Sequence, residues 1–158
     1  MMLRLIEPKD NPIIETIIRT VLTEFGANKP GFAWQDPELS RLAGVYQSDD
    51  KCYLVAEHQG KVVGGAGIAP FQCDLPNVCE LQKMYLLPET RGFGLGQTLM
   101  SDLLCRAKEM GYQYCYLETI GSMTGANLLY QKNGFQRIEE RLGNSGHSAC
   151  DVLYLKTL

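Results

Sequence analysis

The sequence lacks any apolar run of about 18 residues, the length that a membrane-spanning helix needs. It also lacks an excess of basic residues, because 15 lysines and arginines face 18 aspartates and glutamates. Nucleic-acid-binding domains usually carry a basic patch, so this balance argues against a nucleic-acid partner. The first ten residues carry charges where a secretory signal peptide has an apolar stretch. We therefore expect a cytoplasmic protein whose partners include neither a membrane nor a nucleic acid.

Patterns typical of metal sites and disulfide frameworks are also missing. None of the six cysteines forms a CxxC pair, and both histidines, His58 and His147, lie outside the predicted helices. Thiols stay reduced in the cytoplasm. We expect free thiols and no metal site.

The chain has no linker, repeat or low-complexity stretch that would divide it. Its 158 residues are the length of one domain, and an apolar fraction of 45% is ordinary for a globular protein. A chain of this size can bury a core without disulfides or metal. We expect residues 1–158 to form a single domain.

Apolar periodicity and turn residues predict alternating strands and helices. The predicted strands cover residues 3–7, 51–57, 62–70, 78–87, 114–119, 135–140 and 151–156. The predicted helices cover residues 12–25, 37–47, 94–110 and 124–132. The central strand–helix–strand segment requires a parallel crossover, whereas the tight turns require antiparallel pairs. We therefore expect an α/β fold with a mixed sheet and about four helices on its faces.

Three glycines in the strand of residues 62–70 (VVGGAGIAP) weaken it locally. Without side chains they leave room for another backbone or for a ligand.

The most informative segment is a glycine-rich turn before the third predicted helix. A strand ends near Leu87, Pro88 breaks it, and residues 91–96 (RGFGLG) open the helix. Glycines let backbone amides approach a ligand and converge on one point, while a helix N-terminus adds free donors. Arg91 adds a cation beside them. The pattern predicts a phosphate or pyrophosphate site.

Two other phosphate-binding motifs do not match this turn. A P-loop needs a lysine after its last glycine, but Gly96 is followed by Gln97 and Thr98. A dinucleotide fingerprint would need a third glycine at position 97 or 99, which hold Gln97 and Leu99. A tight turn without a ligand and a different nucleotide-binding α/β protein stay open as alternatives.

At this point the residues resemble a known family. Residues 91–96 resemble the [QR]xxGx[GA] signature of the GNAT acetyltransferases, and residues 126–135 (ANLLYQKNGF) resemble that family's second signature, Ax2LYxKxGF. One predicted strand separates the two, as in the family. The predicted element order agrees over nearly the whole chain. The resemblance implies the GNAT fold, with a sheet that is splayed between its fourth and fifth strands.

The resemblance also implies acetyl-CoA as the co-substrate. Backbone groups at the end of the fourth strand would bind its pantetheine arm and polarise the thioester, and the turn would bind its pyrophosphate. The chain departs from the family at Met123, where an asparagine is usual, and Asn127 or Ser122 would have to compensate. The residues assigned to the cofactor are Met84, Tyr85, Leu86, Arg91, Gly92, Phe93, Gly94, Leu95, Gly96, Gln97, Asn127 and Lys132.

Tyr130 corresponds to the family's frequent general acid. A thiolate leaves when an amine displaces CoA, and a phenol near the sulfur can protonate it. The pKa of a thiol is about 8.5 and that of a phenol about 10, so the transfer is not strongly uphill. A role for Tyr130 in packing the cofactor sulfur stays open.

Glu80 is the best candidate for the base that deprotonates the acceptor amine, directly or through water, and Glu118 is a weaker one. Strand alternation places Glu80, Gln82 and Met84 on one face. The alternative roles for Glu80 are a solvated strand residue or an ion-pair partner of Lys83 or Arg137.

The acceptor site of this family forms from the first helices, their loop and the C-terminal strands. Here this implies Phe32 and Trp34, together with His147 as an acceptor contact or a second acid/base group. We expect a small-molecule amine or an amino acid as acceptor. The alternatives are a protein amino group and, from a different class, a non-catalytic acyl-CoA-binding sensor. Dimers are common in the family, so the resemblance also allows a homodimer.

Overall fold

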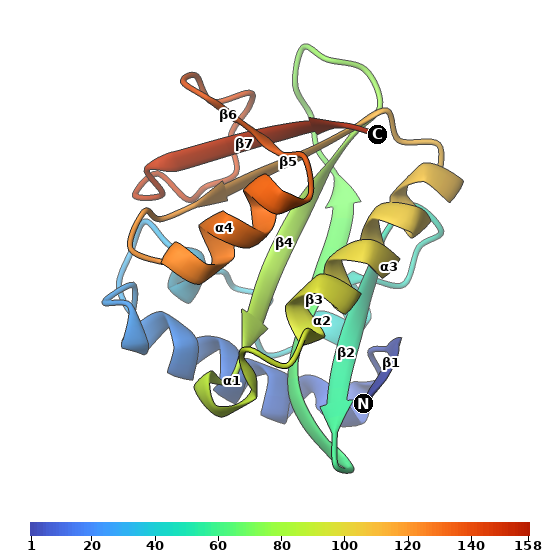
Figure 1. Cartoon of the computed structure of the whole chain (residues 1–158), viewed down its shortest axis with the longest axis vertical. Helices are drawn as coiled ribbons and strands as arrows, with labels where there is room; N and C mark the ends of the chain where they lie inside the picture. Colours follow the sequence, from blue (N-terminus) through green and yellow to red (C-terminus); the bar gives the residue numbers. More distant parts are fainter.

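A seven-stranded mixed sheet forms the centre of the computed structural model, which describes residues 1–158 (Figure 1). The strands are β1 (Met2–Leu5), β2 (Cys52–His58), β3 (Lys61–Pro70), β4 (Val78–Leu86), β5 (Tyr114–Thr119), β6 (Gln136–Ile138) and β7 (Val152–Thr157). They lie in the order β1-β2-β3-β4-β5-β7-β6. Only β4 and β5 are parallel, and the other neighbours are antiparallel. The predicted mixed α/β sheet is therefore confirmed.

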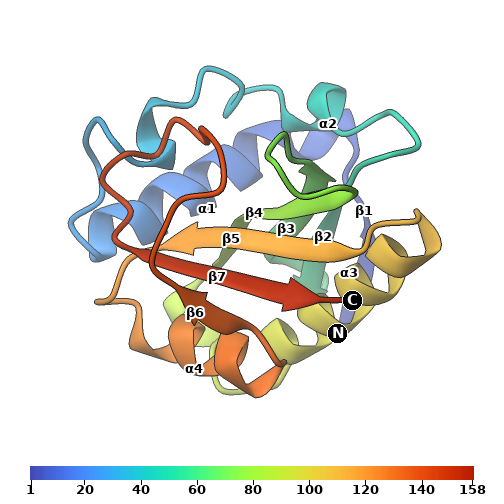
Figure 2. The ribbon, with the colours of Figure 1, turned by 90° about the horizontal axis from the view of Figure 1, so that it is seen from above.

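Helices cover both faces of this sheet, so the molecule has three layers (Figure 2). The helices are α1 (Asn11–Glu24), α2 (Leu42–Val45), α3 (Leu95–Glu109) and α4 (Thr124–Lys132), with short 3-10 turns at η1 (Pro8–Asp10), η2 (Ala33–Gln35) and η3 (Pro88–Thr90). One core cluster joins α1 and α2 to the sheet, and a second joins α3 and α4 to the opposite face. None of the helices combines the length and apolar character that crossing a membrane requires.

The second predicted helix is wrong in extent. The structure has a helix only at Leu42–Val45, and residues 37–40 form turns. The apolar residues of this segment are buried, as Leu39 and Leu42 show with exposures of 1% and 0%. The apolar periodicity therefore indicated burial rather than a long helix. Asp36 and Glu38 instead form ion pairs with Lys83 of β4. The sixth predicted strand, residues 135–140, is likewise shortened to Gln136–Ile138.

The sheet opens between its fourth and fifth strands, as predicted. β4 and β5 pair only at Val78–Tyr114, Cys79–Cys115 and Glu80–Tyr116. Beyond Glu80 the two strands diverge, and the edge of β4 that faces β5 has no strand partner (Figure 1). This fork leaves backbone N–H and C=O groups of β4 free for a ligand.

A β-bulge lies in β4 beside the fork. On β3, Gly65 pairs with Tyr85 and Gly67 with Gln82, so β4 contributes one extra residue to this stretch. Lys83 takes a φ of 51°, in the left-handed region that residues other than glycine rarely adopt. The bulge bends β4 where its edge becomes free.

The bulge also changes which side chains share a face. Gln82 accepts a hydrogen bond from Tyr46 on the α1 side of the sheet, whereas Met84 packs into the core cluster on the α3 side. Our expectation that Glu80, Gln82 and Met84 share one face is therefore wrong, because the extra residue shifts the alternation by one position.

Tyr53 of β2 explains why β3 is rich in glycine. A Cβ added at Gly65 would lie 2.5 Å from Cε1 of Tyr53, and one added at Gly67 would lie 2.7 Å from Cδ2 of the same ring. The ring lies across these two glycines, and its hydroxyl donates a hydrogen bond of 2.9 Å to the Lys83 carbonyl oxygen. At Gly64 a Cβ would overlap the Tyr85 carbonyl. The expected room in this strand is occupied by an aromatic ring and by the β4 backbone.

Candidate active site

The glycine-rich turn presents a set of free amides at the start of α3. Gly92 and Gly94 have φ values of 85° and 82°, and a Cβ at either position would meet no atom within 4 Å. The first backbone bond of the helix runs from Thr98 N to Gly94 O. The amides of residues 95–97 precede this bond, so they have no partner within the helix. Such a turn suits a phosphate group.

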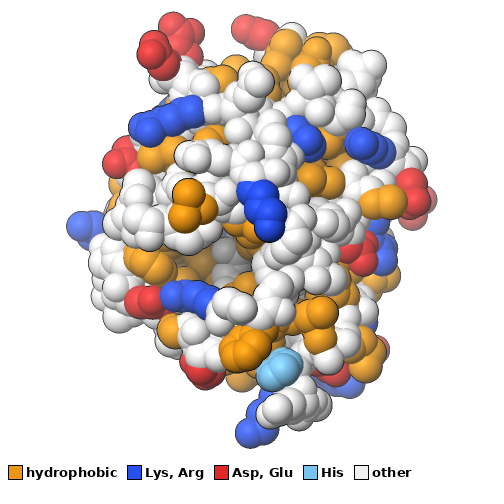
Figure 3. Space-filling view, viewed as in Figure 1, with side chains coloured by type: hydrophobic (Ala, Val, Ile, Leu, Met, Phe, Trp, Pro, Cys, Tyr) orange, Lys and Arg blue, Asp and Glu red, His pale blue; other side chains and the backbone are white.

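A cavity of about 440 Å³ lies beside this turn and extends to the fork in the sheet. Figure 3 shows this face of the molecule hollowed between α4 and the start of α3. The walls come from the end of α1, the end of β4, the turn before α3 and the first two turns of α4. The lining residues are Val21, Phe25, Met84, Tyr85, Leu86, Thr90, Arg91, Gly92, Gly94, Leu95, Gly96, Gln97, Met123, Thr124, Gly125, Ala126, Leu129 and Tyr130. We call it the donor cavity.

Nine of the twelve residues that the sequence assigns to the cofactor line the donor cavity, and three do not. Phe93 is 68% exposed and stacks on His58, with 6.1 Å between ring centroids. Asn127 donates to the carbonyls of Ile120 and Met123 at 3.1 and 2.8 Å, so its amide fixes the start of α4. Lys132 is exposed at the end of α4.

Arg91 lines the donor cavity, but its guanidinium already has partners. It donates two hydrogen bonds to the Glu24 carboxylate, at 2.7 and 2.8 Å, and two to the Leu86 carbonyl oxygen, at 3.2 and 3.0 Å. These bonds hold the pKa of Glu24 below its ordinary value. The sequence predicted a cation beside the phosphates, and the structure shows that this cation also ties the turn to the end of α1.

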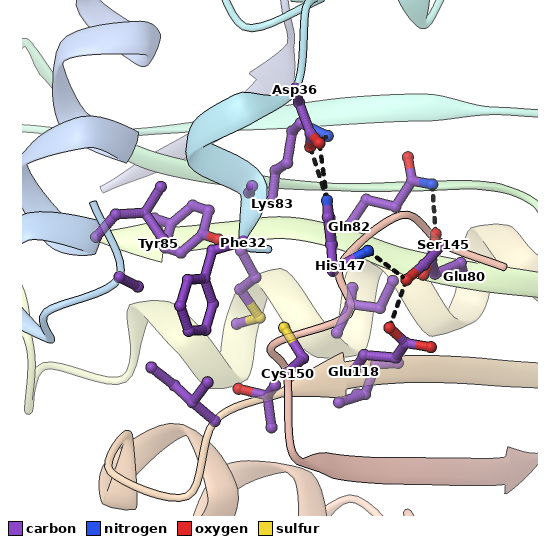
Figure 4. Close-up of a pocket in the computed structure, with 18 of the residues that line it drawn as sticks. Phe32, Asp36, Glu80, Gln82, Lys83, Tyr85, Glu118, Ser145, His147 and Cys150 are labelled. Atoms are coloured by element: carbon purple, nitrogen blue, oxygen red, sulfur yellow. Dashed lines mark hydrogen bonds and ion pairs between the residues drawn. The ribbon is translucent and has the colours of Figure 1, made fainter. Parts of the chain in front are cut away.

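A smaller cavity of about 120 Å³ lies on the other side of the fork (Figure 4). Its walls come from the loop around η2, β4, β5 and the loop before β7. The lining residues are Leu22, Ala27, Phe32, Ala33, Asp36, Glu38, Glu80, Leu81, Gln82, Lys83, Met84, Tyr85, Leu117, Glu118, Thr119, Ile120, Met123, Tyr130, Ser145, His147 and Cys150. We call it the acceptor cavity.

The two cavities meet at Tyr130, which lines both of them together with Met84, Tyr85 and Met123. Tyr130 is 6% exposed, and its ring packs against Phe135 with 6.0 Å between centroids. Burial raises the pKa of Tyr130, so its hydroxyl stays protonated near neutral pH. The residue therefore places a phenolic proton at the junction.

Glu80 lies on the acceptor side of the fork and is 7% exposed. Its Oε1 accepts a hydrogen bond of 2.7 Å from Gln82, whose own Oε1 accepts one of 2.6 Å from Tyr46. Burial raises the pKa of Glu80, against the opposing effect of the Gln82 bond. Lys83 pairs with other carboxylates, so the alternative of a Glu80–Lys83 ion pair is not what the structure shows.

Sequence reasoning missed an ion-pair network on the acceptor side. Lys83 is only 5% exposed, and its Nζ lies 2.8 Å from Asp36 and 3.2 Å from Glu38. His147 Nε2 lies 2.9 Å from both carboxylate oxygens of Asp36. Burial alone would raise the pKa of Asp36, but the His147 hydrogen bond and the Lys83 charge outweigh it and lower the value. The network ties the loop around η2 to the bulge.

Glu118 stands on β5, the other arm of the fork. Its side chain is 1% exposed and accepts hydrogen bonds from Tyr116 at 2.6 Å, from Arg141 at 2.9 Å and from Ser145. Arg141 also donates to the carbonyl of Cys150. Glu118 therefore anchors the loop that carries His147.

Two of the three predicted acceptor residues line the acceptor cavity. Phe32 and His147 line the acceptor cavity, whereas Trp34 lines neither cavity. The Trp34 ring packs under the Arg19 guanidinium, whose Cζ lies 4.6 Å from the ring centroid. We correct the assignment of Trp34 accordingly.

Fold, glycine turn and connected cavities together define a class of acyl-CoA-dependent transferase, and the comparison with known proteins agrees. The model of the acetyltransferase (GNAT) family matches residues 17–135. The chain belongs to this family and is an acyltransferase. It is 44% identical over 152 residues to the uncharacterized N-acetyltransferase YjgM of Escherichia coli, covering 95% of this chain and 90% of that protein. An uncharacterized N-acetyltransferase of Schizosaccharomyces pombe is 29% identical over 133 residues, covering 84% and 80%.

Solved structures show the same fold. A GNAT acetyltransferase from Staphylococcus aureus superimposes with a TM-score of 0.85 at 21% identity, covering 99% of this chain and 98% of that one. The PaiA N-acetyltransferase of Thermoplasma acidophilum, solved in complex with coenzyme A, gives a TM-score of 0.77 at 18% identity, with 99% and 98% covered.

Proposed function

We propose that this chain acts as one cytoplasmic domain that moves an acetyl group from acetyl-CoA to a primary amine of a small molecule. Transfer is direct, with both substrates bound together. The observation that carries the proposal is the junction at Tyr130, where a phosphate-accommodating donor cavity meets an acidic acceptor cavity. The CoA bound to the PaiA structure supports the donor assignment.

The donor cavity fits the parts of acetyl-CoA, whose thioester supplies the activated acetyl group. The amides of residues 95–97 bind the pyrophosphate, helped by the partial positive charge of the helix N-terminus. Gly92 and Gly94 leave the approach open because they have no Cβ. The free edge of β4 beyond Glu80 offers backbone groups to the pantetheine arm and to the thioester carbonyl oxygen.

Two side chains move the protons of the reaction. Glu80 accepts a proton from the acceptor ammonium, directly or through water, so that the amine nitrogen can attack the acetyl carbon. As the new C–N bond forms and the C–S bond breaks, Tyr130 donates its phenolic proton to the sulfur, and the second proton of the attacking nitrogen returns to the Tyr130 oxygen. Holding both substrates at one junction supplies much of the rate gain.

The acceptor cavity favours a small molecule over a protein amino group. Its volume is about 120 Å³, and loops from both ends of the chain form its walls. A protein acceptor would have to insert a single side chain. The homodimer that the family resemblance allows plays no part in this proposal.

Replacing Tyr130 with phenylalanine tests the reaction. The variant keeps the ring but loses the proton, so kcat should fall by about a hundredfold or more. The affinity for acetyl-CoA, measured by calorimetry, should change by less than about twofold, because a single uncharged hydroxyl contributes little to binding a ligand of this size. Tyr114→Phe is the matched control, because Tyr114 lines neither cavity. An unchanged kcat would remove Tyr130 from the acid role, and a loss confined to affinity would indicate packing.

A further inference from the structure

The acceptor cavity carries an uneven set of charges. Four carboxylates line it, whereas Lys83 and His147 are the only lining residues that can carry a positive charge. Figure 4 labels three of these carboxylates on separate elements: Asp36 on the loop after η2, Glu80 on β4 and Glu118 on β5. The four residues are Asp36, Glu38, Glu80 and Glu118.

Every cation near this cavity is already engaged by the protein. Lys83 lies between Asp36 and Glu38. His147 bonds Asp36, and Arg141, which stands behind the wall, bonds Glu118. A carboxylate on an incoming substrate would therefore find no free positive charge and would face like charges, which is unfavourable in a site shielded from water.

Two polar atoms without hydrogen-bond partners face the cavity, and one of them, Glu80 Oε2, can accept a hydrogen bond from a ligand. Glu80 is only 7% exposed, and its Oε1 accepts the Gln82 hydrogen bond while its Oε2 makes none. No fully buried side-chain polar atom of the chain lacks a partner, so this oxygen opens onto the cavity it lines. The Tyr130 hydroxyl is likewise without a partner at the junction. An ammonium group supplies three donors and no acceptor.

The occupant is an organic molecule with an apolar part. No group of three or more histidine, cysteine, aspartate or glutamate side chains is placed to hold a metal ion. The carboxylates come from the loop after η2, from β4 and from β5, while Phe32, Ile120 and Met123 supply apolar surface in the same cavity. An amine on an alkyl or aromatic skeleton matches both surfaces.

We propose that the acceptor is a cationic amine without a carboxylate, such as an alkyl diamine, and that the acidic wall excludes amino acids. This inference rests on the proposed function, because it concerns the second substrate of that reaction. It narrows our own expectation from the sequence, which included amino acids. The specificity arises from repulsion of a carboxylate as much as from attraction of an ammonium.

Matched pairs of amines test this inference directly. Cadaverine and L-lysine share a skeleton and differ by one carboxylate, as do tyramine and L-tyrosine. Calorimetric titration of each into the full chain saturated with CoA should give dissociation constants at least tenfold lower for the amines. Equal or tighter binding of the amino acids would overturn the inference, and so would the absence of binding by either amine.

This readout is independent of turnover. Failure of the proposed reaction would instead appear as no thiol release from acetyl-CoA with any of the four compounds, whatever their binding. The two failures are therefore distinguishable.

Substitutions on the wall extend the test. Glu118→Gln removes one negative charge and frees Arg141, so the preference for cadaverine over lysine should shrink at least threefold. Asp36→Asn tests a second carboxylate by the same ratio, if Glu118→Gln does not fold. The control is Glu140→Gln, because Glu140 is exposed and lines neither cavity. An unchanged ratio in a folded wall variant would overturn the electrostatic argument.

Discussion

Replacing Tyr53 with phenylalanine would test how the fold holds the β4 bulge. Tyr53 is 1% exposed, and its hydroxyl donates a hydrogen bond of 2.9 Å to the Lys83 carbonyl oxygen. Lys83 has a φ of 51°, which the surrounding structure must stabilise. The ring itself fits against Gly65 and Gly67, so phenylalanine keeps the packing and removes one bond.

The expected loss can be worked from that single bond. A buried carbonyl left without its donor costs about 1–3 kcal/mol. The Lys83 side chain is buried, but the residue as a whole is partly exposed, so water near its backbone replaces part of the bond and places the expectation at about 1–2 kcal/mol. For a domain of this size each kcal/mol lowers the melting temperature by about 2–4 °C.

Urea unfolding of both proteins measures this difference, and Tyr114→Phe is the matched control because Tyr114 is partly exposed and lines neither cavity. Since the bulge sets the edge of β4 along which we propose that the thioester binds, kcat of the folded Tyr53→Phe protein should also fall. If the variant unfolded at the same urea concentration as the control and kept its kcat, the hydrogen bond would not hold the bulge and the reasoning would be refuted.

Two further substitutions follow from the site and the sheet. Because burial raises the pKa of Glu80, its contribution to stability is present below the unfolded pKa of about 4.5 and is lost as pH rises through the folded value. Glu80→Gln should therefore unfold at a higher urea concentration than the parent at pH 7 but not at pH 4, and it should lose most of its kcat. A variant as stable as the parent at both pH values would contradict this. Gly64→Ala should lose about 1–3 kcal/mol in urea unfolding, because its Cβ would overlap the Tyr85 carbonyl. Gly44→Ala, whose Cβ meets nothing, is the control, and equal stability of the two would show that β4 yields without strain.

The donor cavity could be predicted from sequence because its chemistry is local. In the proposed function backbone amides bind the phosphates, so the requirement falls on consecutive residues that permit the turn, and Gly92 and Gly94 indicate it. The strand before the turn and the helix after it also follow from periodicity within one stretch. The partner of Arg91 was missed for the complementary reason, since Glu24 is distant in sequence and reaches the turn only through the packing of α1.

The acceptor cavity could not be predicted in the same way, because side chains from four separated segments build it. Nothing in the sequence near Lys83 marks the extra residue of the bulge, which depends on Tyr53 lying across the glycines of the next strand. At the bulge the Lys83 side chain pairs with Asp36, and Asp36 in turn bonds His147. Each of these pairings depends on tertiary contacts. The sequence alone therefore does not indicate whether an acidic side chain will be paired with a cation of the protein or accessible to a substrate. Under the proposed function, changes at Asp36 or Glu118 should therefore alter which amine enters, while the turn before α3 should continue to bind the same donor.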